Sequence, residues 1–158
     1  MEYNIVTLPE YRGVGLKWEG AYAEVSTLKE TIYHMKDRAK ELEEAVDRNV
    51  QLGLSYHLRP DGFTHYSVYE VNKSQQIPAG MIEIIIPELT YLHVYHERGR
   101  DIGETYTQIY RWFKEINYIP YKDERKYYDE LPVKHERYPA DRDLSDPHFE
   151  ILIPVVNR

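Results

Sequence analysis

Two long helical patterns, each followed by strand-like segments, limit the folds that are open to this chain. From Glu24 to Val46 apolar residues recur every three or four positions, which is the spacing of an amphipathic helix. A second pattern of this kind runs from about Ile102 to Ile116, and Asp101 is placed to cap its N-terminus. We interpret both apolar stripes as core-facing, because helices gain most of their stability from packing.

The other apolar segments have the composition and alternation of β-strands. One strand, from Gly13 to Glu19, precedes the first helix, and the hairpin-turn sequence Arg59-Pro60-Asp61-Gly62 separates two later ones. The predicted strands after the first helix are 54–58, 63–71, 81–86, 91–97, 136–138 and 149–155. The segment from Pro120 to Pro147 is predicted to be a long loop of the kind that forms lids, with a short helical turn near 124–130.

The order strand, helix, strand, strand occurs twice, and local motifs match between the two halves. Lys17-Trp18-Glu19-Gly20 corresponds to His96-Glu97-Arg98-Gly99, and His65-Tyr66-Ser67-Val68 corresponds to His148-Phe149-Glu150-Ile151. We predict a single domain, residues 1–158, made of a duplicated β-α-β-β unit with halves at about 1–80 and 81–158. The expected fold class is α+β, with one antiparallel sheet, two long helices on one face and a central cleft between them.

Composition excludes several classes of function. The absence of cysteine excludes disulfides, thiolate catalysis and Cys-ligated zinc, and His93 and His96 fall on opposite faces of a strand. We therefore expect no metal and no cofactor. The net charge of -7 argues against direct contact with nucleic acid. No apolar run approaches the roughly 20 residues that cross a membrane, and no signal-peptide pattern is present, so the expected location is the cytoplasm without a membrane partner.

One acidic residue stands out in the last predicted strand. Glu150 lies among β-branched and aromatic residues, where an unpaired carboxylate costs several kcal/mol. We predict that it lies on the floor of the cleft, as the counter-charge for an organic cation or as a general acid/base. The alternative follows from period-two alternation, in which Phe149 and Ile151 face the core and Glu150 lies on an exposed face.

The aromatic residues are candidates for the walls of this cleft. The chain contains 16 Tyr, 2 Trp and 3 Phe, and a Tyr hydroxyl must find a partner when it is buried, so Tyr suits a pocket better than a purely structural core. The predicted ligand contacts beside Glu150 are Trp18, Tyr95, Tyr110 and Trp112. If the site is catalytic, Tyr110 or Tyr138 is the predicted hydrogen-bond partner of Glu150. For each ring the alternative is ordinary aromatic core.

Four motifs resemble those of the GyrI-like effector-binding domains, which form the ligand-binding half of some multidrug-sensing transcription activators. They are Ile77-Pro78-Ala79-Gly80-Met81, Tyr91 to Gly99, Tyr110-Arg111-Trp112-Phe113, and Phe149 to Val155. The resemblance implies a duplicated fold with a pocket between its helices, where a glutamate matching Glu150 pairs with lipophilic cations. The chain has no spare length for a helix-turn-helix, so direct DNA binding is not expected.

The leading hypothesis is a stand-alone binding protein for amphipathic, cationic aromatic molecules, linked to transcriptional regulation or to drug and toxin sensing. The resemblance leaves two alternatives. Some stand-alone relatives hydrolyse cyclopropane-bearing electrophiles with the matching Glu and a Tyr, so Glu150 would be the general base. The founding relative inhibits DNA gyrase, so a protein partner such as gyrase or a regulator is the third hypothesis.

Overall fold

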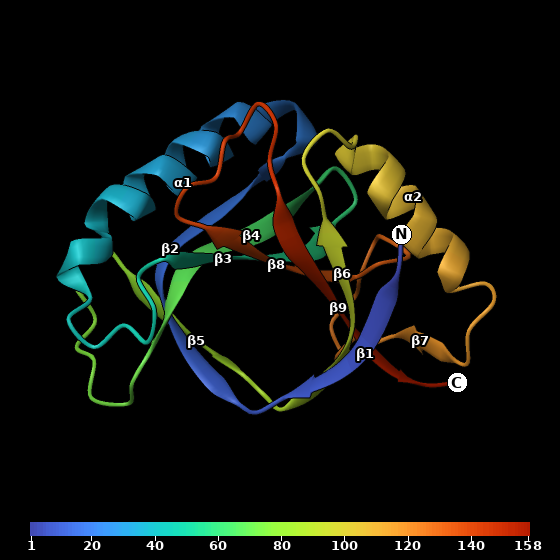
Figure 1. The fold of residues 1–158 in the computed structure, drawn as a ribbon. Helices are drawn as coiled ribbons and strands as arrows, with labels where there is room; N and C mark the ends of the chain where they lie inside the picture. The colour runs from blue at the N-terminus through green and yellow to red at the C-terminus, as the bar shows by residue number, and fades with distance from the viewer.

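The computed structural model describes residues 1–158 as one antiparallel sheet with two helices against one of its faces (Figure 1). The helices are α1 (Val25–Arg38) and α2 (Ile102–Trp112), with 3-10 turns at Tyr22–Glu24 and Ala39–Glu41. The strands are β1 (Tyr3–Leu8), β2 (Tyr11–Ala21), β3 (Val50–Arg59), β4 (Gly62–Val71), β5 (Ile82–Ile86), β6 (Leu89–His96), β7 (Tyr118–Pro120), β8 (Val133–Pro139) and β9 (Phe149–Asn157). The predicted α+β class is confirmed. Neither helix has the length and apolar character needed to span a membrane.

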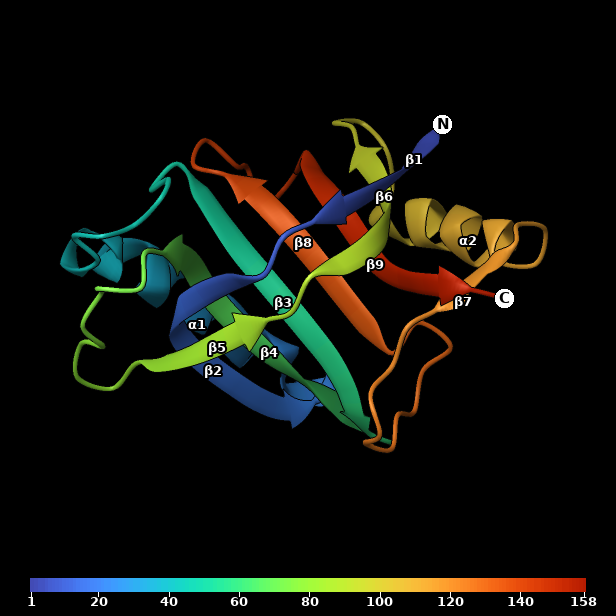
Figure 2. The same ribbon diagram turned by 90° about the horizontal axis from the view of Figure 1, so that it is seen from below.

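The sheet bends into an arch because its two ends are tied together. Its strand order is β1-β6-β9-β8-β3-β4-β2-β5, with β7 beside β9. β1 continues into β2 and β5 continues into β6, and the two ladders keep one register, since Leu8 pairs with Leu89 and Tyr11 with Ile86. These long strands cross the side of the sheet that faces away from the helices (Figure 2). We call the region enclosed between them and the central strands the arch interior.

Apolar residues pack on both faces of the central strands. On the helix face, α2 packs through Ile109 and Phe113 against β6 and β9, and α1 packs through Met35 against β2 and β4. A third cluster fills much of the arch interior and comprises Leu52, Leu54, Tyr56, Val68, Ile86 and Val133. Between the two helix clusters, β3 and β8 carry polar residues on the helix face, namely Gln51, Ser55, Lys134, Glu136 and Tyr138. This polar strip lies between α1 and α2 and marks the floor of a cleft.

Two local signals in the sequence predicted the structure correctly. The predicted hairpin turn connects β3, which ends at Arg59, to β4, which begins at Gly62. The predicted N-cap Asp101 accepts a hydrogen bond through Oδ2 from the backbone N–H of Glu104 at 3.1 Å. Both signals depend on side chains that act within a few residues, so no tertiary information was needed.

The first helix is shorter than predicted. It ends at Arg38 and is followed by a 3-10 turn, although the apolar spacing continues to Leu42 and Val46. Acidic side chains are unfavourable near the negative end of a helix dipole, and Glu43 and Glu44 follow here. Leu42 is nonetheless fully buried in the cluster around Met35 of α1. The turn therefore brings Leu42 into the core, as the predicted helix would have done. β1 and β7 were not predicted, and residues 124–130 form no helical turn.

Two histidines inside the sheet are expected to make the fold sensitive to acid. Burial lowers the pKa of His65 and of His135 to about 3 from 6.5. Between those values the unfolded chain binds protons that the folded chain does not, so stability falls as the pH falls through this window. Each histidine is expected to cost about 2 kcal/mol at pH 5 relative to pH 7.5. The raised pKa of Glu136 acts in the opposite direction, because the folded state holds that proton more tightly.

Urea unfolding at pH 5 and pH 7.5 measures this effect. In the variant His135→Gln the loss between the two pH values should be smaller by about 2 kcal/mol than that of the unchanged chain, because one titrating histidine is gone. A loss of the same size in both proteins would show that His135 binds its proton equally in the folded and the unfolded chain.

Candidate functional site

The polar strip is centred on Glu136 of β8. Tyr106 of α2 donates a hydrogen bond to Oε2 of this carboxylate, and Tyr138 of β8 donates one to Oε1. Burial raises the pKa of Glu136, while the hydrogen bond from Tyr106 opposes that shift. The nearby Lys134 does not pair with it, since its Nζ lies 3.5 Å from Asp129 Oδ2. Glu136 is therefore an acid held by two phenols, with no ion pair of its own.

The local sequence of β3 makes room for these side chains. Gly53 is the direct cross-strand partner of Glu136. A Cβ atom at Gly53 would lie 2.8 Å from Cε2 of Tyr138 and 2.9 Å from Cε1 of His65, closer than side chains pack. The missing side chain thus lets two rings approach the centre of the strip. Of the two facing strands, only β8 carries an acid at this position.

A cation of the chain itself lies in the same cleft. The guanidinium carbon of Arg142, in the connection between β8 and β9, lies 3.6 Å from the centroid of the Tyr138 ring. Its Nη1 atom is buried and has no hydrogen-bond partner. Burial lowers the pKa of Arg142, and the nearby Glu136, Tyr33 and Tyr69 act in the opposite direction. The geometry is that of a cation stacked on an aromatic face beside an acid.

The segment that carries Arg142 crosses between the two helices (Figure 1). Lys36 Nζ of α1 donates to the carbonyl of Ala140 at 3.2 Å. At the other end of the segment, Asp146 Oδ1 accepts a hydrogen bond from the backbone N–H of Gly99, close to α2, at 2.7 Å. We call residues 140–147 the cover segment. This segment, part of the predicted long loop, thus bridges α1 and the start of α2, and its action as a lid stays a prediction.

A cavity of about 180 Å³ lies beside Arg142 on the α1 side of the cleft. The rings of Tyr33, Tyr69 and Tyr138 form part of its wall, together with Ile32 and the side chain of Gln51. Gln51 is fixed by hydrogen bonds from its Nε2 to the carbonyl of Ile32 and to Ser67 Oγ. The wall also carries three cations, Lys36, Arg48 and Arg142. Glu136 is not part of the wall but accepts a hydrogen bond from Tyr138, which is. The aromatic area suits a flat organic molecule.

Further polar contacts occupy the part of the cleft next to α2. The hydroxyl of Tyr110 donates to Asp129 Oδ1 at 2.6 Å, and burial is the largest cause that raises the Tyr110 pKa. Tyr22 and His57 share a hydrogen bond at 3.2 Å. Tyr110 follows Tyr106 by four residues on α2, so both hydroxyls project from one helix face. Tyr110 was predicted to contact the site acid, but its partner is Asp129.

Glu150 does not lie in the cleft. Phe149 and Ile151 pack against α2, so Glu150 points away from both helices. Its Oε1 lies 2.9 Å from His93 Nε2 and its Oε2 lies 3.5 Å from Arg137 Nε, and 32% of its side chain is exposed. The alternative based on strand alternation describes this residue, and the predicted position on the cleft floor is wrong.

The incorrect placement of Glu150 follows from the motif match between the two halves. It equated His65 and Ser67 with His148 and Glu150, but the first pair faces the helices whereas Glu150 faces away. Side chains alternate between the faces of a strand, so an alignment shifted by one residue inverts every assignment. The neighbour of Glu150 on the helix face of β9 is Phe149, whose ring centroid lies 5.0 Å from that of Tyr138.

Three predicted aromatic contacts lie outside the cleft. Trp18 is core beneath α1, where it packs on Phe63 and donates through Nε1 to Thr27 Oγ1 at 2.8 Å. Trp112 packs at a tilt against the ring of Tyr3 of β1, with a centroid distance of 4.8 Å. Tyr95 is 47% exposed on the face of the sheet away from the helices. Of the predicted residues, only Tyr138 contacts the acid at the centre of the cleft.

Sequence reasoning missed Glu136, Tyr106 and Arg142. One signal for the first was present, because Glu136 and Tyr138 are two apart in a predicted strand and therefore share a face. The charged run from Lys134 to Arg137 concealed it, since such a run reads as solvated surface. No local pattern pointed to Arg142, whose position depends on the path of the cover segment.

Comparison with known proteins agrees with this architecture. The model of the GyrI-like small molecule binding domain matches residues 1–156. A search of curated protein sequences found no match. Among solved structures, EcmrR in a complex with DNA superposes with a TM-score of 0.72 at 15% identity, over 99% of this chain and 58% of that one. The chain thus spans less than two thirds of EcmrR.

Two further structures are similar along most of their length. SAV2435 bound to tetraphenylphosphonium has a TM-score of 0.69 at 13% identity, covering 99% of this chain and 94% of that one. A hydrolase encoded by lin2189 from Listeria innocua has a TM-score of 0.59 at 10% identity, covering 98% and 92%. At these identities the likeness is one of fold. The family match over nearly the whole chain goes further, and the chain belongs to the GyrI-like small-molecule binding domain family.

Proposed function

We propose that the chain binds amphipathic aromatic cations in the cleft between α1 and α2. Glu136, which accepts the hydrogen bond of Tyr138 beside the cavity, supplies the negative charge. Tyr33, Tyr69 and Tyr138 supply aromatic surface, in a wall that also carries Lys36 and Arg48. The observation that carries the proposal is the position of Arg142, a planar, delocalised cation stacked at 3.6 Å on Tyr138. The cleft therefore holds the kind of group that the proposed ligand would present.

Binding on this proposal is an exchange of one cation for another. The ligand takes the place of the guanidinium over Tyr138, and the cover segment moves to admit it. The exchange favours an organic cation because it brings apolar ring area into the cleft, whereas Arg142 can return to water. When the ligand is bound, the Nη1 atom of Arg142, which lacks a hydrogen-bond partner in the cleft, is exposed to water.

The proposal is tested with two ligands of nearly equal shape. N-methylquinolinium is a flat aromatic cation, and 1-methylnaphthalene is its uncharged counterpart. Isothermal titration calorimetry should show the cation binding at least about tenfold more tightly, because a desolvated cation–aromatic contact beside an acid contributes about 2 kcal/mol. Equal affinities for the two ligands would show that their charge does not contribute to binding and that the cleft is an apolar pocket.

A hydrolase is the second candidate, because the raised pKa of Glu136 is suited to a general base. The chain also shares its fold with the Listeria innocua hydrolase. Against it, both carboxylate oxygens already accept hydrogen bonds from Tyr106 and Tyr138. Incubation with a cyclopropane-bearing electrophile, with Glu136→Gln as the blank, decides the matter: ring-opened product that depends on Glu136 supports it, and its absence rejects it.

A role in drug or toxin sensing would use the cover segment as the reporter. Because this segment connects α1 to the start of α2, a ligand that displaces it alters the surface above the cleft. A regulator or gyrase that contacts that surface would then bind differently in the two states. Pull-down of a partner with and without N-methylquinolinium measures this, and capture that is identical in both conditions argues against a sensing role.

A further inference from the structure

The arch interior contains a second cavity, on the opposite side of the sheet from the cleft. Its volume is about 270 Å³, and its walls come from β3, β6, β8, β9 and the connection between β1 and β2. The apolar part of the wall comprises Leu8, Val50, Leu52, Leu54 and Leu152. β3 and β8, which form the floor of the cleft between the helices, separate the two cavities. A ligand in one therefore has no path through the sheet to the other.

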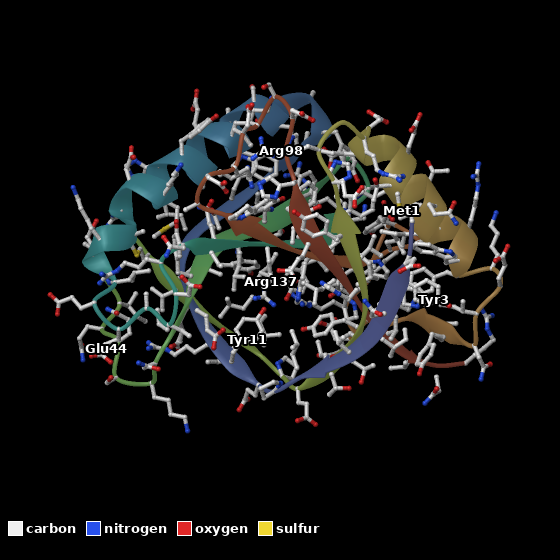
Figure 3. The ribbon with its side chains drawn as sticks, in the orientation of Figure 1. Met1, Tyr3, Tyr11, Glu44, Arg98 and Arg137 are labelled. Atoms are coloured by element: carbon white, nitrogen blue, oxygen red, sulfur yellow. The ribbon has the colours of Figure 1, made fainter.

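The buried polar side-chain atom of this cavity that lacks a hydrogen-bond partner is a donor. Tyr91 is 1% exposed, and its hydroxyl is buried with no hydrogen-bond partner. Tyr11 faces the same cavity, and burial raises the pKa of both phenols, so each keeps its proton. Arg137 reaches in from β8 and makes only the 3.5 Å contact to Glu150 (Figure 3). A buried hydroxyl without a partner is destabilising, and an acceptor in the cavity would relieve that cost.

His135 closes the inner end of the cavity without competing for that acceptor. Its Nε2 shares a hydrogen bond of 3.2 Å with the hydroxyl of Tyr56, and its ring centroid lies 5.7 Å from that of Tyr91. Burial lowers the His135 pKa to about 3, so the ring is neutral near pH 7. Glu70 and Asp47 also line the cavity, and both side chains are exposed. A cation has no buried carboxylate to meet here, in contrast to the cleft.

We propose that the arch interior is a second binding site, for small apolar molecules that end in a carbonyl or carboxylate oxygen. The apolar body packs against the leucines of β3 and β9, and the oxygen accepts a hydrogen bond from Tyr91. Tyr11 and Arg137 stand close enough to the same region to add donors. The site is independent of the proposed cation site in both place and chemistry.

The test uses three naphthalenes that differ in one substituent: methyl 2-naphthoate, 2-naphthoate and 2-methylnaphthalene. Calorimetry on the full chain, saturated with N-methylquinolinium to fill the cleft, should show that the two oxygen-bearing molecules bind more tightly than the hydrocarbon. Tyr91→Phe should weaken their binding about fivefold, the value of one buried hydrogen bond. Tyr95→Phe, a change of the same kind on the exposed part of the same strand, should leave it unchanged.

Two further readouts separate the outcomes. Tyr91→Phe without ligand should be as stable as the unchanged chain or more so, because it removes an unpartnered hydroxyl. If Arg137→Gln weakens only the acid, the natural class is a carboxylate, and if it weakens neither, the class is a neutral carbonyl compound. Failure of all three probes to bind, or equal loss in the Tyr95→Phe control, overturns the proposal. Because Glu136 does not line this cavity, Glu136→Gln should leave naphthoate binding intact whatever happens to cation binding.

Discussion

Replacing Glu136 by glutamine is expected to weaken the binding of N-methylquinolinium about thirtyfold. The change removes the one acid at the centre of the cleft, and the lost attraction of a desolvated cation corresponds to about 2 kcal/mol. Glutamine keeps the shape of the side chain and one carbonyl oxygen for the phenols of Tyr106 and Tyr138. Burial already raises the pKa of Glu136, so a neutral residue is well tolerated there and the variant should fold.

Glu150→Gln is the matched control for this experiment. This change neutralises the acid of β9, which pairs with His93 and faces away from the helices. Its affinity for the cation should stay within about twofold of the unchanged chain, since exposed ion pairs contribute about 0–1 kcal/mol. The opposite result, a large loss for Glu150→Gln and none for Glu136→Gln, would place the ligand on the other face and sink the proposed function.

Removal of Arg142 is expected to strengthen cation binding about tenfold. In Arg142→Ala the ligand no longer has to displace an internal cation from the Tyr138 ring, a contact of about 1–2 kcal/mol at a partly buried site. The affinity for the neutral 1-methylnaphthalene should rise less, because the loss of the positive charge of Arg142 favours only the charged ligand. Titration of both ligands into both proteins gives the comparison directly.

Arg142→Lys separates charge from shape in the same assay. Lysine keeps the positive charge but lacks the flat surface that stacks on the ring, so its affinity for the cation should lie between those of the other two proteins. If instead Arg142→Ala binds both ligands more weakly, then Arg142 is part of the ligand-binding wall. In that case the idea that it holds the place of the ligand is wrong.

The architecture could be predicted from the sequence because its signals are local. Apolar spacing placed α2, and turn residues placed the junction of β3 and β4. β1 was not predicted because the strand is only six residues long, is half exposed and is followed directly by Pro9. Its strand character comes from pairing with β6, far along the chain, and no window around residues 3–8 contains that information.

The site could be predicted only in kind. An acid among tyrosines between two helices was expected, and the structure contains one, but the acid is Glu136 rather than Glu150. The choice between them depends on which face of its strand each residue occupies. That face is fixed by the register of β8 against β3, where Gly53 stands opposite Glu136. Register arises from pairing across the sheet, so inspection of either strand alone could not supply it.

The shared ladder of β1 with β6 and of β2 with β5 has a consequence for how the protein is made. β1 is synthesised before the other strands of this sheet, yet Tyr3 pairs with Val94, so its partner strand is synthesised much later. Contacts of such long sequence separation form slowly, and an unpaired strand is prone to associate with other chains. The yield of native protein in a cell should therefore depend on how well β1 is shielded until β6 has been synthesised.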